Sequence, residues 1–311
     1  MTDLAPLKSA LRLIGEDPAQ VLGPGTAHLV AFGHDIVSRA GVSGLTMDVA
    51  SNADGIRARI QVERGAQISN AVHLCFGLFQ LQGVQNVDLE LRLKAGACAT
   101  FWSHCLFAQA EHARHTMNAR VEIEEGANLT YQEAHYHGAS GDIEVTPRAS
   151  IRLGPRARYR ADFSLVQGRV GHLDIDYEVN VGAEAVAELT SKVYGHRNDR
   201  IRIREAVRLN GERARGLIRS RIAADGDSCA EVLGITEGNA AYARGHVDCL
   251  EIVRERAQVS ALPEVRVTHP LAKVTHEAAI GSVDHRQLET LMSRGVPPEE
   301  AVDIIVREML R

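Results

Sequence analysis

Apolar and polar residues alternate along the chain from about residue 28 to residue 280. Segments such as RIQVERGAQI, RVEIEEGANLTY and HLDIDYEVNVG carry Val, Ile or Leu at nearly every second position, with Arg, Glu, Asp or Thr between them. A period of two is typical of strands that bury one face. The pattern therefore predicts a mainly β protein.

Glycines that suit turns recur between these segments at nearly constant spacing. They are Gly65, Gly96, Gly126, Gly154, Gly182 and Gly211. The near-equal intervals between them fit a repeat made of two strands of about ten residues and two turns. One repeat cannot bury its apolar face alone, so we expect the repeats to stack as rungs of a parallel β-helix. An irregular β-sandwich with evenly spaced glycines is the alternative.

Helical periodicity is confined to the two ends of the chain. The sequence therefore divides into a helical segment over residues 1–27, a β-helix core over 28–280 and a second helical segment over 281–311. In the first segment a short amphipathic helix ends at Gly15, where a left-handed cap is favourable. Its apolar face consists of Leu4, Leu7, Leu11 and Ile14.

The last segment predicts two helices. Asp284 and Gln287 resemble a capping box at the start of a helix that ends at Gly295, and Leu288, Leu291 and Met292 are its apolar residues. Pro297 and Pro298 suit the first turn of the next helix. The apolar face of this helix consists of Val302, Ile305, Val306 and Met309. Such a face either packs within the chain, which we favour, or binds a partner.

Composition and charge narrow the range of possible binding partners and of cellular compartments. The 311 residues carry 40 acidic and 35 basic side chains, so the net charge of −5 provides no broad cationic field for nucleic acid or an anionic membrane. The arginine-rich stretch over residues 197–221 alternates with acids and is interpreted as a solvated strand face. The opening residues resemble neither a signal peptide nor a membrane span, and the five cysteines form no CxxC pair. We expect a cytoplasmic protein with reduced thiols.

Motifs of common enzymes are absent from the sequence. The chain has no GxxxxGK[ST] phosphate loop, no GxGxxG after a strand, no HExxH and no GxSxG. We therefore expect no catalytic activity of its own. Any ATP hydrolysis would have to be supplied by a partner.

Spacing brings cysteine, histidine and glutamate together at the late end of the repeat. The intervals from Cys249 to His276 and Glu277, and from His246 to His276, are all close to the length of one repeat. Residues one rung apart can approach to about 5 Å, the distance between neighbouring strands. Thiolate and imidazole suit iron and its clusters, and a carboxylate can complete such a site. The structural alternative is that Cys249 is a small core residue and that His276 bonds a turn carbonyl.

A second column lies in the early rungs. Cys75, Cys105 and His135 follow one another at equal intervals that match the length of one repeat. Further histidines lie near this column: His73, His104, His137 and, in a stretch that we interpret as a loop, His112 and His115. The column is either a site for metal or sulfur or a buried apolar ladder in which cysteine acts as a small hydrophobe. Cys105, His135, His137 and His246 are accordingly weaker metal-ligand candidates.

Residues 246–311 resemble a known family. The runs HVDCLEIVRERAQVSALPEV, THEAAIGSVDHRQLETLMSRG and EEAVDIIVREML are similar to the C-terminal signature of the SufB and SufD proteins of iron-sulfur cluster assembly. The resemblance implies a right-handed parallel β-helix with helices at both termini. It also implies dimerisation through the β-helix, as a homodimer or a SufB/SufD-type dimer, and association of the C-terminal helices with the ABC-type ATPase SufC.

Site residues follow from the resemblance position by position. Cys249 stands where SufB has the cysteine that holds the nascent cluster, Glu277 where SufB has a glutamate ligand, and His276 where both SufB and SufD have a histidine. SufD typically has glycine after that histidine, so this chain is more similar to SufB. The chain is shorter than typical SufB, and the cysteine that receives sulfur there is not identified; Cys75 or Cys105 are candidates.

The expected function is that of a scaffold that holds a transient iron-sulfur cluster, of the 4Fe-4S type, on a homodimer. A ligand set that contains a carboxylate holds the cluster less firmly than four thiolates, which favours its transfer. The alternatives are a SufD-like partner that binds no cluster and a carbohydrate-active β-helix enzyme. Aromatic residues make up only 4% of the chain, which leaves few platforms for stacking sugars.

Overall fold

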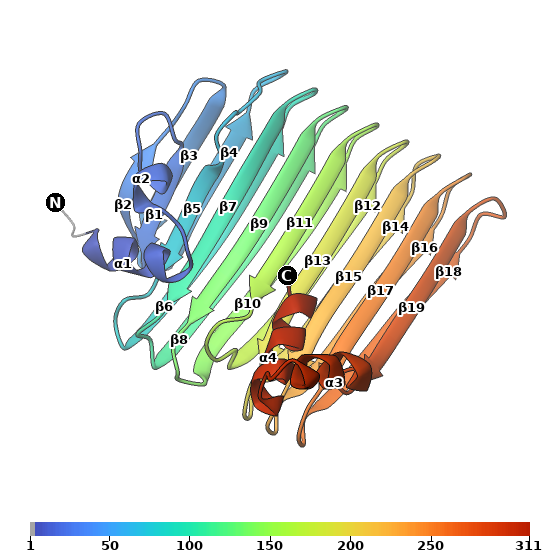
Figure 1. The fold of residues 1–311 in the computed structure, drawn as a ribbon. Helices are drawn as coiled ribbons and strands as arrows, with labels where there is room; N and C mark the ends of the chain where they lie inside the picture. Colours follow the sequence, from blue (N-terminus) through green and yellow to red (C-terminus); the bar gives the residue numbers. More distant parts are fainter. Residues whose placement is uncertain (1–3) are drawn as a thin grey trace.

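The computed structural model describes residues 4–311 and shows two long sheets wound into one β-solenoid (Figure 1). The first sheet has ten strands in the order β19-β17-β15-β13-β11-β9-β7-β5-β1-β2 and the second has nine in the order β18-β16-β14-β12-β10-β8-β6-β4-β3. The strands of the first sheet are β1 (His28–Phe32), β2 (Asp35–Ala40), β5 (Val72–Gly77), β7 (Cys98–Phe107), β9 (Asn128–His137), β11 (Arg158–Leu165), β13 (Val186–Gly195), β15 (Arg215–Ala224), β17 (Arg244–Val253) and β19 (Lys273–Gly281).

The second sheet lies face to face with the first. Its strands are β3 (Leu45–Asn52), β4 (Gly55–Val62), β6 (Gln82–Leu93), β8 (His112–Ile123), β10 (Asp142–Leu153), β12 (His172–Val181), β14 (Arg200–Leu209), β16 (Cys229–Gly238) and β18 (Gln258–Val267). The four helices are α1 (Ala5–Leu13), α2 (Pro18–Val21), α3 (His285–Ser293) and α4 (Pro298–Met309). Helices thus occur at the two ends, as the sequence predicts.

Parallel pairing between successive rungs confirms the predicted coil. His112 pairs with Asp142 of the next rung, and Arg158 pairs in the same way with Val186. The sandwich alternative is therefore wrong. The sequence did not predict the first rung, where β1 and β2 pair antiparallel, as do β3 and β4.

The recurring glycines occupy two different places in the same turn. Gly126 adopts the left-handed backbone conformation with φ of 66°, and in the next rung a non-glycine residue, Arg156, takes that place with φ of 57°. Gly211 has no such φ. A Cβ at Gly211 would lie 2.0 Å from the Ala183 nitrogen of the preceding rung, so close approach of two backbones explains this glycine. The regular spacing therefore combines two physical requirements.

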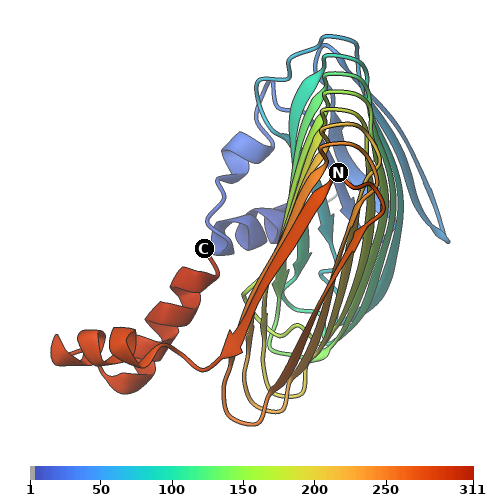
Figure 2. The same ribbon diagram turned by 90° about the vertical axis from the view of Figure 1, so that its right-hand side faces the viewer.

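The interior of the solenoid is filled by the inward residues of both sheets. Along β6 and β12, Val, Leu and Ile at every second position are buried. The last rung is different, because no further rung covers it. Its inward residues are partly exposed, and Ile280 reaches 47% exposure. Figure 2 looks toward this end, with β18 and β19 nearest the viewer and the C-terminal helices projecting from one side.

The terminal helices pack on the outer face of the first sheet. Leu7 and Leu11 of α1 join Val30, Cys75 and Leu106 in one buried cluster. Val306 and Leu310, from α4 and its C-cap, join Ala223 and Ile252 of β15 and β17 in another. The apolar face of the last helix therefore packs within the chain, chiefly on strands. Helix α3 buries none of its residues, and its predicted cap is present, because Asp284 accepts a hydrogen bond from the Gln287 amide at 2.9 Å.

The arginine-rich segment spans β14 of the second sheet and the start of β15 of the first sheet, and its β14 arginines lie on the outer face. Arg202 and Arg204 of β14 pair with Asp174 and Asp176 of the preceding rung, at 3.3 and 2.6 Å. These pairs support the interpretation as a solvated strand face, in which the acids of one rung neutralise the arginines of the next.

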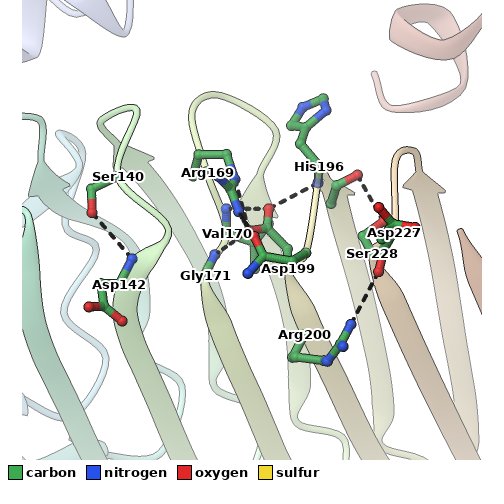
Figure 3. A network of polar contacts seen from close by, with 12 residues as sticks. Ser140, Asp142, Arg169, Val170, Gly171, His196, Asp199, Arg200, Asp227 and Ser228 are labelled. Carbon is green, nitrogen blue, oxygen red and sulfur yellow. Dashed lines mark hydrogen bonds and ion pairs between the residues drawn. The ribbon is translucent and has the colours of Figure 1, made fainter.

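A buried ion pair fixes the turns at the middle of the stack (Figure 3). The Asp199 carboxylate accepts hydrogen bonds from Arg169 Nε and Nη2 at 2.9 and 2.7 Å. It also accepts bonds from the amides of Val170, Gly171 and His196, at 2.9 to 3.0 Å. Asp199 is 1% exposed, so its charge depends on these partners.

We predict that Asp199→Ala destabilises the fold strongly. Removing the carboxylate leaves the Arg169 guanidinium with Asn198 Oδ1, at 2.7 Å, and no opposite charge, and it leaves three amides without their acceptor, which costs about 3 to 5 kcal/mol. Asp227→Ala is the control, because Asp227 pairs with Arg256 at 2.7 Å on the exposed surface and should matter little. Thermal unfolding followed by circular dichroism measures both, and equal losses in the two variants would contradict the prediction.

Candidate functional site

The late-end residues do not all meet in one chain. Val247 pairs with His276, Asp248 with Glu277, and Cys249 with Ala278. Since side chains alternate along a strand, Cys249 and His276 lie on the inward face, on neighbouring rungs, while Glu277 lies on the outward face beside Asp248. The expectation that all three share one face is therefore wrong within a single chain. Spacing alone missed this because the intervals from Cys249 to His276 and to Glu277 fall one or two residues short of the register here, which pairs Cys249 with Ala278.

The surroundings of these residues differ as well. Cys249 is 1% exposed and belongs to the main core cluster, as the structural alternative predicted, whereas His276 and Glu277 are exposed on the edge strand. His246 lies on the outward face and pairs in register with Thr275, whose hydroxyl is 2.8 Å from its Nδ1. Burial raises the pKa of the Cys249 thiol, and a hydrogen bond from Ser220 partly opposes that rise.

The early column also separates into two faces. Cys105 pairs with His135, as predicted, but Cys75 pairs with His104 and faces outward beneath the N-terminal helices. Cys75 is therefore not part of the inward column. On the outward face, His73 Nδ1 lies 3.2 Å from His104 Nε2.

A group of polar side chains surrounds Cys105 inside the solenoid. The Glu133 carboxylate lies 2.7 Å from His135 Nε2, and the Cys105 sulfur lies 3.7 Å from His115 Nε2. Cys105, Glu133 and His135 can present three ligand atoms within 4.8 Å of one another. His115 comes from β8 of the opposite sheet, so the group, which we call the interior cluster (Cys105, His115, Glu133 and His135), spans both sheets.

Burial controls the protonation of the interior cluster. It raises the pKa of Glu133 to about 7 and that of the Cys105 thiol well above its ordinary value. It lowers the pKa of His115 and of His135 to about 3. Near neutral pH the thiol and both imidazoles are therefore uncharged, and the carboxyl is partly protonated.

A second group of polar side chains lies between this cluster and Cys249. Ser191 donates a hydrogen bond to Glu205 at 2.6 Å, and Ser220 donates one to Glu251 at 2.8 Å. Burial raises the pKa of each of these glutamates to about 7. Ser191, Ser220 and Cys249 occupy one inward column of β13, β15 and β17.

Several of these residues were not predicted from the sequence. Glu133, Glu205 and Glu251 stand at inward positions of otherwise apolar alternation, which is a signal that the sequence contains. His115 was expected in a loop but lies in β8. Its contact with Cys105 depends on how the two sheets face each other. The spacing of repeats predicts only which residues are neighbours within one sheet.

Comparison with known proteins identifies the family of this chain. The family model described as "SUF system FeS cluster assembly, SufBD core domain" matches residues 78–309. The chain belongs to the SufBD family. A SufBD-family iron-sulfur cluster assembly protein of Methanocaldococcus jannaschii is 35% identical over 99% of this chain and 98% of its own. One from Pyrococcus horikoshii is 31% identical over 93% of this chain and 88% of its own.

Two expectations can be judged against this family. Involvement in iron-sulfur cluster assembly is supported, because the SufBD family serves that process. The short length, which departs from typical SufB, is shared with the relative from M. jannaschii.

Of the four helices within residues 4–311, none combines the length and apolar character needed to span a bilayer.

The buried glutamates predict a pH dependence of stability for this SufBD protein. Folded Glu205 keeps its proton up to about pH 7, while the unfolded chain releases it near 4.5. The folded state therefore loses stability relative to the unfolded state as pH rises from 4.5 through 7, by up to about 3 kcal/mol.

We predict that Glu205→Gln, which removes this titration, gains thermal stability relative to the parent chain between pH 5 and pH 8. Glu188→Gln is the control, because Glu188 is an exposed carboxyl of β13. Melting temperatures of the three proteins at both pH values test the prediction. A difference between the parent and Glu205→Gln that stays constant with pH would contradict it.

Proposed function

We propose that the chain is a SufB-like scaffold that holds a transient iron-sulfur cluster, of the 4Fe-4S type, with Cys249 as the thiolate ligand. The observation that carries the proposal is the position of Cys249. Its sulfur faces inward on the last fully covered rung, and His276 lies on the same face of the open rung beyond it. Thiolate and imidazole are ligands suited to iron-sulfur clusters.

Glu277 completes the ligand set of this proposal only after a rearrangement or from a second chain. It lies on the outward face of β19, which pairs with β17 on one side and is open on the other. An edge strand held by one neighbour can move at lower cost than an interior strand. Exposure of Cys249 would also require β19 to move. A single movement of this strand would therefore expose Cys249 and reposition Glu277.

A second copy of the chain is the proposed cover of the open rung. Leu262, Val267, Leu271 and Ile280 at this end are 47 to 53% exposed. Apolar side chains on an uncovered rung favour burial against a partner. A homodimer formed here would enclose two copies of Cys249 and His276, and sedimentation equilibrium that finds only monomer at micromolar concentration would contradict it.

The proposed ATPase partner is a SufC-like ABC protein bound through the C-terminal helices. Helix α3 is amphipathic yet buries none of its residues, so its surface is available to a partner. Because α4 packs on β15 and β17, and β17 pairs with β19, movement of the helices could reach the edge strand. We propose that ATP-driven movement opens the dimer interface in the cytoplasm and admits iron and sulfide; the sulfur donor stays open.

We predict that Cys249→Ala abolishes the visible absorbance that anaerobic reconstitution with iron and sulfide produces in the parent chain. Loss of the thiolate removes the anchoring ligand, so bound iron and acid-labile sulfide should fall at least about tenfold. Cys229→Ala is the matched control, because Cys229 begins β16 on the opposite sheet. A full chromophore in Cys249→Ala would exclude the assignment.

Binding of the ATPase, measured together with cluster binding, distinguishes the SufB-like scaffold from a SufD-like partner. A parent chain that binds the ATPase but never acquires a cluster would be a SufD-like partner instead. Pull-down with an ABC ATPase of the SufC type, run beside the reconstitution, distinguishes the two.

A further inference from the structure

We propose that the interior cluster is a second site, which binds one divalent transition-metal ion between Cys105, Glu133, His135 and His115. The inference is independent of the cluster proposed at Cys249. Cys105 on β7 and Cys249 on β17 are five strand spacings apart in the first sheet, which is about 24 Å. No single ion or cluster could therefore contact both.

The distances within the interior cluster suit a four-ligand site. Ligand atoms of a tetrahedral ion bound at about 2.0 to 2.3 Å lie roughly 3.3 to 3.8 Å apart. The Cys105 sulfur and His115 Nε2 are already 3.7 Å apart. Glu133 and His135 are closer, at 2.7 Å, because a shared proton now joins them. A metal ion would displace that proton and the thiol proton of Cys105 to solvent, and would separate the Glu133 and His135 atoms slightly.

Charge balance favours a divalent ion at this position. The four side chains are 0 to 5% exposed, so an uncompensated charge here would be very costly. A thiolate and a carboxylate together carry two negative charges, which a divalent ion neutralises, and two imidazoles add ligands without charge. Cysteine and histidine with a single carboxylate favour zinc, iron or cobalt over magnesium or calcium.

An unpartnered nitrogen atom of His137 provides a second, independent observation. His137 Nδ1 donates to the Arg169 carbonyl at 2.9 Å, which leaves its buried Nε2 unprotonated and without a partner among the described residues. Metal-binding histidines commonly have this arrangement, with one nitrogen anchored to a carbonyl and the other free. His137 adjoins His135, with ring centroids 5.7 Å apart, and is a reserve ligand.

Space beside the cluster is also present. A cavity of about 30 Å³, lined in part by Glu133, Tyr131 and Tyr177, adjoins the carboxylate. This is enough for one water molecule. The Tyr177 hydroxyl is 3.4 Å from the second carboxylate oxygen and would orient it. A water molecule in this cavity would lie beside Glu133 and could act as a further ligand of the ion.

The test uses cobalt(II) as the probe. The full chain is produced in cobalt-supplemented medium, so that the ion can enter while the chain folds, and is purified without air. We expect about one cobalt per chain and a thiolate-to-cobalt charge-transfer band in the near ultraviolet. Cys105→Ser should lose that band, and Glu133→Gln should lower the cobalt content at least tenfold.

Matched controls separate this site from other thiols. Cys75→Ser removes a buried thiol on the opposite face of the neighbouring strand and should keep both the band and the cobalt content. Cys249→Ser should keep them too, whereas Cys105→Ser should still reconstitute a cluster if the scaffold proposal holds. Parent-level cobalt and charge transfer in Cys105→Ser, or parent-level cobalt in a folded Glu133→Gln, would overturn the inference, as would a parent chain that binds no cobalt.

Discussion

Parallel hydrogen bonding between successive rungs is the constraint on which the structure depends. It holds residues of neighbouring rungs side by side at about 5 Å. A shift of one residue moves a side chain from the core to the surface. This is why Cys249 lies beside Ser220 and Ala278 while Glu277 lies beside Asp248. Each column of the interior is therefore a fixed series of neighbours, and the candidate chemistry follows those columns.

The interior of the solenoid contains three buried glutamates among its apolar residues. Glu133, Glu205 and Glu251 are nearly fully buried at positions where valine or leucine would fit the pattern. Burial of a carboxyl is unfavourable unless a partner compensates, and each of the three has one, in His135, Ser191 and Ser220 respectively. Strongly shifted pKa values in such a setting are typical of functional sites. The interior thus contains two groups of buried polar side chains that are candidates for function, one near Cys105 and one near Cys249.

The sequence predicted most of the architecture because the alternation of apolar and polar residues, and the spacing of glycines, follow from local backbone geometry. The alternation predicted strands, the recurring glycines predicted rungs, and Asp284 predicted the start of a helix. The site was harder, because counting rungs needs single-residue accuracy: Cys105 and His135 were placed correctly, whereas Cys75 and Glu277 were placed on the wrong face. His115 was out of reach of such counting, since only the three-dimensional facing of the two sheets brings it to Cys105.

The register at the edge strand can be measured directly with engineered disulfides. Parallel neighbours on one face have Cα atoms at about 4.8 Å, within the range that a disulfide spans. After mild oxidation and peptide mapping of the monomeric species by mass spectrometry, Ala278→Cys should be found crosslinked to Cys249 within one chain, and Glu277→Cys should not. A crosslink from Glu277→Cys with none from Ala278→Cys would contradict the account, because it would place Glu277 on the face of Cys249.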